Sequence, residues 1–235
     1  VGADGKGVPQ SVVGFDTPIP DFSDCNFATR EPDADWGAIA HGGGPVRGFS
    51  RLMPAFGDAL PGADIQLAID HIRTFCAEPA WPRGELNLPR PMFTEKAYPE
   101  DEAVWTTGLA LSGPGEITNQ LVYERRFGAV NQIEFKLPLA VSHTPGASWN
   151  GGAGDIGIGV KRAIHHDLSR GRIFSVAGEV VLPTGDESSG QGSGALKVEP
   201  FVAFGQILRN DAFFQAQAGA EFSANRDRAG HEAFW

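Results

Sequence analysis

The chain has few residues of the kinds that usually carry metal or redox chemistry. Its 235 residues include two cysteines, two methionines and six histidines, and the cysteines form no Cys-x-x-Cys pair. A metal site built on closely spaced cysteine and histidine ligands is therefore not expected. The sequence also contains no nucleophile elbow, phosphate-binding loop or paired-carboxylate motif, so nothing in it indicates an enzyme.

Long apolar runs and basic clusters are also missing. No stretch has the length and apolar character of a transmembrane helix or a secretory signal peptide. The formal net charge is −10, and no segment gathers lysine and arginine into a nucleic-acid footprint. Nucleic acid is therefore excluded as a partner. The chain does not begin with methionine, and we expect that an upstream segment is missing.

The composition changes near residue 100. Residues 1–102 contain 16 acidic and 8 basic residues, both cysteines and most of the prolines, whereas the remainder is rich in glycine and alternating apolar residues. We predict an N-terminal domain over 1–78, a linker over 79–102 and a second domain over 103–235. The linker contains five prolines, and proline favours an extended, semi-rigid segment.

Met53 lies in a loop, directly before Pro54. The residues that follow place Ile65, Ile69 and Ile72 at four- and three-residue spacing, which predicts an amphipathic helix. A loop methionine usually fills a gap in an apolar core. A thioether held in a turn before a helix can also be a soft axial ligand of haem iron. The residues alone leave both interpretations open.

Ser50–Leu60 and the helix after it resemble the methionine-ligand loop and final helix of class I c-type cytochromes. Gly2–Gly7 is similar to the run that follows the Cys-x-x-Cys-His attachment motif in that family, and Thr17–Phe22 is similar to its proline loop. The resemblance implies a small all-α domain that binds haem c. It assigns Met53 as the axial iron ligand and Pro20 to the haem-contacting loop.

The resemblance also suggests partners for two arginines. Arg47 and Arg51 flank the methionine loop, and guanidinium groups suit the carboxylates of haem propionates; ordinary surface charge is the alternative. His41 ends a predicted helix and is a rival iron ligand, although a solvent-facing histidine is the simpler interpretation.

Val1 stands where the family has its proximal histidine, so this chain as given cannot attach haem covalently. We expect N-terminal truncation, with a lineage that has lost haem as the alternative. Cys25 and Cys76 are expected to pair if the protein is exported, and the alternative is two buried free thiols.

From residue 103 the apolar residues recur at every second position. In Ile133–Val141, for example, odd positions are apolar and Glu134 and Lys136 occupy even ones. This period predicts antiparallel strands, and we place about seven of them: 103–112, 116–127, 132–142, 153–164, 171–183, 195–208 and 211–224. An eighth would begin near Ala233. The predicted fold class is thus a multidomain α + β chain, with an up-and-down sheet or partial barrel.

Alternation fits either a soluble sandwich with one wet face or a membrane barrel with a wet lumen. Strands of ten or more residues favour the barrel, because sandwich strands are usually shorter. The segment Leu182–Asp186 with Gly192–Gly194 resembles a signature loop of outer-membrane barrels of the phenol-pathway MetA type, a resemblance that extends over 154–222. On this interpretation Glu179, Glu199 and Glu221 line the lumen, and the barrel is truncated at its C-terminal end.

The predicted connections alternate between short turns and long loops, as in outer-membrane barrels with periplasmic turns. This places the N-terminal domain in the periplasm of a Gram-negative cell. The leading hypothesis is an electron carrier tethered to the outer membrane, with membrane lipid and a periplasmic redox partner, and with a small solute if the barrel conducts. The alternatives are a transport or structural barrel with a haem-free module, and a soluble two-domain binding protein.

Overall fold

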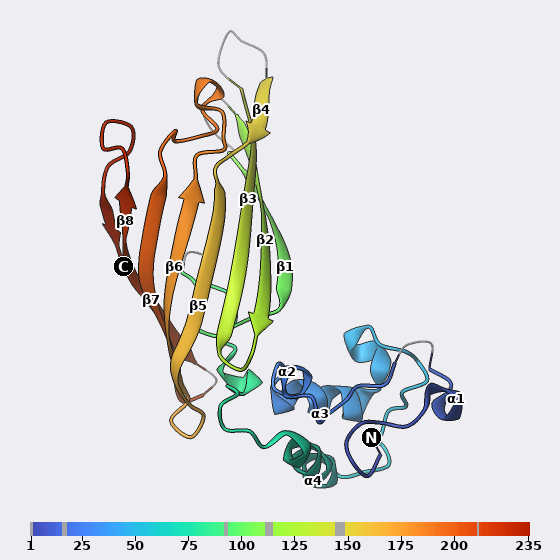
Figure 1. Ribbon diagram of the computed structural model, residues 1–235. Coiled ribbons are helices and arrows are strands. Elements are labelled where there is room, and N and C mark those ends of the chain that lie inside the picture. The colour runs from blue at the N-terminus through green and yellow to red at the C-terminus, as the bar shows by residue number, and fades with distance from the viewer. Residues whose placement is uncertain (1, 16–17, 92–93, 111–114, 144–148, 211) are drawn as a thin grey trace. The chain divides into compact units, whose positions relative to one another are not determined.

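A computed structural model describes residues 2–15, 18–91, 94–110, 115–143, 149–210 and 212–235. Contacts divide the chain into two units, shown in Figure 1. The helical unit comprises Val1–Pro89 together with Asp167–Gly171, and the sheet unit comprises Arg90–His166 together with Arg172–Trp235. None of the helices in the described ranges is both long enough and apolar enough to cross a membrane.

The helical unit consists of short helices joined by proline- and glycine-rich turns. They are α1 (Gln10–Val13), α2 (Cys25–Ala28), α3 (Asp33–Gly42), η1 (Gly44–Arg47), α4 (Gly62–Arg73), η2 (Thr74–Cys76) and η3 (Gly84–Leu86). Proline immediately precedes α3 and α4, where its fixed φ suits a helix start. Helix α4 has the predicted amphipathic pattern, because Ile65 and Ile69 are buried.

Arg73 connects the ends of the two longest helices. Its Nε donates to Asp33 Oδ1 at 2.7 Å, and its Nη2 donates to the carbonyl of Glu31 at 2.7 Å. The guanidinium carbon also lies 3.7 Å from the centre of the Trp36 ring, a cation–π arrangement. The C-terminal end of α4 is thereby fixed to the N-terminal end of α3.

A disulfide joins Cys25 and Cys76, whose Cα atoms are 5.3 Å apart. The bond links the start of α2 to the end of η2. Within the helical unit it closes a long loop that encloses both α3 and α4.

In the part of the sheet unit that the structure describes, nine strands form one antiparallel sheet, with the order β1-β2-β3-β5-β6-β7-β8-β9 and β4 paired to β3. Figure 1 shows the long strands side by side. Their bounds are β1 Glu102–Leu109, β2 Glu116–Phe127, β3 Asn131–His143, β4 Trp149–Ala153, β5 Ile156–Asp167, β6 Arg172–Leu182, β7 Lys197–Ile207, β8 Phe213–Ser223 and β9 Glu232–Phe234. The sheet is not closed: β1 and β9 are its edges in this order.

The register fixes which side chains share a face. Tyr123 lies opposite Phe135, and Glu124 lies opposite Glu134. Successive side chains point to opposite faces of a strand, so aromatic residues gather on one face and charged residues on the other. We call these the apolar face and the polar face.

The predicted antiparallel sheet is confirmed, and the mixed class is supported in its coarse form: a large sheet with a few short helices. The strand expected to begin near Ala233 is β9, which pairs with β8. The short strand β4, which folds back onto β3, was not expected. Positions 111, 112 and 211 of the predicted strands lie outside the described residues. The boundary between the two units falls after Pro89, within the predicted linker 79–102.

Replacing Cys25 and Cys76 with serine together should lower the stability of the helical unit by about 4 kcal/mol, because the bond constrains a loop of about fifty residues. Urea unfolding followed by tryptophan fluorescence would measure the loss, and a separate transition of the sheet unit should not move. An unchanged first transition would show that the bond contributes little.

Candidate functional site

The polar face of the sheet carries buried charged side chains. Glu124 is only 2% exposed, and Glu134, Lys161 and Glu179 are each below 10%. Removing such groups from water costs several kcal/mol per ion unless they are paired. The strands therefore need a partner on this face, and residues 94–101 supply it.

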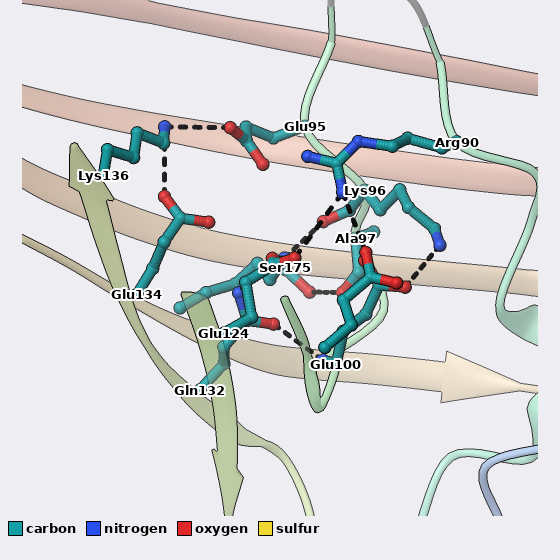
Figure 2. A network of polar contacts seen from close by, with 12 residues as sticks. Arg90, Glu95, Lys96, Ala97, Glu100, Glu124, Gln132, Glu134, Lys136 and Ser175 are labelled. Atoms are coloured by element: carbon teal, nitrogen blue, oxygen red, sulfur yellow. Dashed lines mark hydrogen bonds and ion pairs between the residues drawn. The ribbon is translucent and has the colours of Figure 1, made fainter. Parts of the chain in front are cut away.

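Lys136 is the centre of the charge network on this face. Its Nζ lies 3.0 Å from Glu95 Oε1, 3.0 Å from Glu134 Oε1 and 2.7 Å from Glu179 Oε2. Figure 2 shows the ammonium group between the carboxylates of Glu95 and Glu134. One cation thus bridges residues 94–101, strand β3 and strand β6.

Other side chains on the polar face of the sheet, which we call the wall, bind the backbone of residues 94–101. Lys161 Nζ donates to the carbonyl of Lys96 at 2.9 Å, and Ser175 Oγ donates to the carbonyl of Ala97. The amide of Glu100 donates to Gln132 Oε1 at 2.7 Å.

At the start of the segment, the amide of Glu95 donates to Gln217 Oε1 on β8 at 3.0 Å. Buried backbone groups need such partners, and side chains from four strands provide them.

Two glycines on β5 make room for these carboxylates. A Cβ at Gly157 would come within 2.2 Å of Glu179 Oε1, and a Cβ at Gly159 would come within 3.4 Å of Glu134 Oε1. Glycine at position 157 is therefore required for Glu179 to reach Lys136.

Burial and charge act in opposite directions on the carboxyl groups of residues 94–101. Burial raises the pKa of Glu100 above its ordinary value of 4.5, even though Lys96 Nζ pairs with it. Burial also acts to raise the pKa of Glu95, but the charges of Lys136 and Lys161 outweigh it and lower that pKa.

Carboxylate oxygens of Glu95, Glu124 and Glu134 lie within 4.8 Å of one another. Such a group could hold a cation, but in this structure Lys136 pairs with two of the three residues. Glu124 accepts from Gln132 Nε2 at 2.6 Å and faces Arg90 at 3.7 Å. The protein's own cations thus compensate these acids.

The loops at one end of the sheet meet at Asp155. Its carboxylate accepts from the amide of Gly185 at 2.9 Å and from the amide and hydroxyl of Ser193 at 2.7 and 2.6 Å. These bonds lower the pKa of Asp155 against the opposing effect of burial. Gly185 and Ser193 belong to the two parts of the segment, Leu182–Asp186 and Gly192–Gly194, that the sequence analysis compared with a signature loop. The carboxylate of Asp155 therefore holds these two parts together.

In the helical unit, the end of α3 holds the Met53 loop. The carbonyl of Met53 accepts from the amide of Gly44 at 3.1 Å, and the amide of Gly57 donates to the carbonyl of His41 at 3.0 Å. Gly43 has φ of +81° and lies against the backbone of Met53 to Ala55, so only a residue without Cβ fits there. The side chain of Met53 is half-buried.

A groove of about 540 Å³ lies between α3, η1 and α4. Small residues line its α3 side, and Ile65 and Ile69 line its α4 side. Val46 also lines the groove, whereas Met53 does not. Apolar side chains along the loop are exposed, namely Val46, Phe49, Leu52, Phe56 and Leu60.

The other residues that the sequence analysis considered for haem binding are Arg47, Arg51, Pro20 and His41, and their surroundings differ from one another. Arg47 forms an ion pair with Asp35, so it is engaged within the protein. Arg51 and Pro20 are exposed, and in the described ranges Arg51 has no ion pair. The ring of His41 lies against Gly57.

The Gly2–Gly7 run packs against two other segments of the helical unit. The amide of Phe22 donates to the carbonyl of Gly5 at 2.8 Å. A Cβ at Gly5 would meet the ring of Phe75 at 2.6 Å. Thr17 and Val1 lie outside the described residues.

Sequence reasoning assigned Glu179, Glu199 and Glu221 to a lumen wall but missed Lys136, Lys161 and Ser175 as a connected site. Alternation placed Lys136 on the polar side of its strand, so part of the signal was present. Nothing in the sequence indicated that residues 94–101 lie against that wall, because they were interpreted as linker.

Searches of protein-family models, curated proteins and solved structures return no match to this chain. The functional argument therefore depends on the residues and their geometry.

Stability should depend on pH through Glu100. The pKa of Glu100 is higher in the folded protein than in the unfolded chain. The wild-type protein therefore loses stability as the pH rises from the pKa of the unfolded state through the pKa of the folded state. Glu100→Gln removes this titration, so its stability relative to wild type should rise across that window. Urea unfolding in detergent micelles from pH 4 to 8 measures the difference, with Glu102→Gln as the partly exposed control. A difference that does not vary with pH would contradict the argument.

Proposed function

We propose that this chain belongs to an electron-transfer protein of the Gram-negative outer membrane. The sheet unit serves as wall of a lipid-facing β-barrel, and the helical unit serves as a haem c electron carrier in the periplasm. The single observation that carries the proposal is the sidedness of the sheet, with exposed apolar side chains on one face and buried charges on the other.

The apolar face exposes large side chains to an extent that is unusual in water. Trp105 is 57% exposed, Phe127 52% and Val160 56%. The same face exposes further apolar residues along the strands: Tyr123, Phe135, Val141, Ile164, Val176, Val180, Val198, Val202 and Phe222. Soluble monomers rarely expose such continuous patches.

A soluble antiparallel sheet packs its apolar face into a core and exposes its polar face. This sheet has the opposite arrangement, since Glu124, Glu134 and Lys161 are buried. Apolar side chains outward and polar side chains inward are the pattern of outer-membrane barrels. Membrane lipid is therefore the medium that best suits the apolar face.

Three features of the helical unit support an electron-carrier role. Met53 offers a thioether from a loop fixed by Gly43 and Gly44. A groove of about 540 Å³ between α3 and α4 is lined by small and apolar residues, among them Val46, although Met53 is not part of its lining. Apolar side chains from Val46 to Leu60 are exposed and would be covered by a large apolar group.

Met53 would hold the iron of a bound haem through its sulfur, which is a soft ligand. When bound, the haem supplies a one-electron redox couple. The chain's own part is to present the sulfur, exclude water with its apolar side chains and leave Arg51 free for carboxylates. A periplasmic redox partner would exchange electrons with this unit.

A second candidate is a transport or structural barrel with a haem-free helical module. The Cys25–Cys76 bond and the Arg73 network favour it, because they hold the helical unit together through its own residues. Haem binding by the full chain separates the two candidates.

Val160→Lys should destabilise the protein in lipid by about 2–4 kcal/mol if position 160 lies near the bilayer centre, because it places a charge on the lipid face. Chemical unfolding from phospholipid vesicles measures the effect. Ser188→Lys, at an exposed position in the short 3-10 helix η4 (Glu187–Ser189) between β6 and β7, is the control and should change little. A chain that remains in solution without detergent and tolerates Val160→Lys would contradict the membrane assignment.

Met53→Ala in the haem-loaded protein should abolish the sulfur-to-iron absorption band and lower the reduction potential, because the thioether ligand is lost. Leu52→Ala, in the same loop, should retain the band. If Met53→Ala leaves the spectrum unchanged, Met53 is not a ligand.

A further inference from the structure

We propose that residues 94–101 are a plug that covers the polar face of the sheet where Glu124, Glu134, Lys161 and Glu179 are buried, with Lys136 as the latch that holds it. This inference goes beyond the electron-transfer proposal, because it concerns the sheet unit alone and does not require haem. It implies that these buried charges become accessible to water or a solute only when the plug leaves.

The plug is buried although it contains no regular secondary structure. Lys96 is 9% exposed, Ala97 3%, Tyr98 2% and Glu100 6%. Loops normally run over the surface because their backbone groups need water. This one is placed against the sheet, so its burial requires specific partners on the wall.

Those partners come from strands far apart in the sheet. Lys136 on β3 pairs with Glu95, Ser175 on β6 donates to Ala97, and Gln217 on β8 accepts from Glu95. Figure 2 shows Glu95, Ala97 and Glu100 directed toward side chains of the wall. The plug therefore spans several strands rather than extending the sheet at an edge.

Little space remains between the plug and the wall. The cavity bounded by Glu95, Gln132, Glu134, Lys161 and Glu179 has a volume of about 10 Å³. A cavity needs about 10–15 Å³ to hold one water molecule. A solute cannot pass between the wall and a plug seated in this way.

Among the described side chains that contact the plug, Lys136 forms the most ion pairs. It pairs with Glu95 on the plug while two wall carboxylates, Glu134 and Glu179, compete for the same ammonium. Loss of this cation leaves three acids facing one another without the ammonium that pairs with all three. The plug carries one of the three and is the part that can move away.

The test uses the full chain with Ala97→Cys, measured by the labelling rate with a charged, membrane-impermeant maleimide. Cys25 and Cys76 are bonded to each other, so the thiol at position 97 is the sole reactive one. Labelling should be slow, because this position is 3% exposed. Adding Lys136→Met should accelerate labelling about tenfold or more, since breaking a buried pair is strongly unfavourable.

Lys197→Met is the matched control. Lys197 pairs with Glu221 at 3.0 Å and is 21% exposed, against 18% for Lys136. Its loss should leave labelling at position 97 slow. Lys136→Arg should also keep labelling slow, because it preserves the charge.

A second reporter separates plug release from unfolding of the sheet. Ala195→Cys lies in the β6–β7 loop, where the native alanine is 2% exposed. Lys136→Met should not change labelling there. Equal acceleration at both positions, no acceleration at position 97, or fast labelling before any change at Lys136 would each overturn the proposal.

Discussion

The contact between Lys136 and its three carboxylates is the interaction on which the sheet unit depends. Glu134 and Glu179 lie on different strands, and Glu95 lies on the plug. Without a shared cation these acids would repel one another in a region that water reaches poorly. Because one ammonium pairs with three carboxylates at once, the cost of burying them is reduced.

The sidedness of the sheet follows from the same constraint. Polar and apolar side chains alternate along each strand. When the charged residues are fixed on the polar face, the apolar residues must lie on the opposite, apolar face. If β3 slipped by one residue against β2, Phe135 would lie against the plug and Glu134 on the opposite face, while β2 kept its orientation. The ion network thus selects the register, and the register in turn creates the apolar face.

The sequence predicted the strands well, because alternation over ten residues is a strong local signal. It predicted β2 at 116–127, the observed bounds. It also placed an eighth strand near Ala233, where β9 lies, but missed β4, which is short and depends on pairing with a strand already in place. The place of residues 94–101 could not be predicted, because proline-rich composition describes local stiffness and carries no signal of a distant wall.

The candidate site likewise has a part that the sequence predicted and a part that it did not. Alternation placed Glu134 and Lys136 on a polar side, but the reach of Lys136 to Glu179 depends on the absence of a side chain at Gly157. A glycine in a strand usually indicates a bulge or a close approach of backbone. Here it indicates a close approach of side chains across three strands, which becomes visible only once β3, β5 and β6 are adjacent.

Two separate features of the chain support the same cellular compartment. A disulfide such as Cys25–Cys76 persists in an oxidising environment, and the bacterial periplasm is one. An antiparallel sheet with an apolar outer face and a charged inner face suits the outer membrane, which borders that space. The first feature belongs to the helical unit and the second to the sheet unit, so neither observation depends on how the units are arranged. A cytosolic location would leave the disulfide open to reduction and the apolar face open to aggregation, and one change of compartment removes both problems.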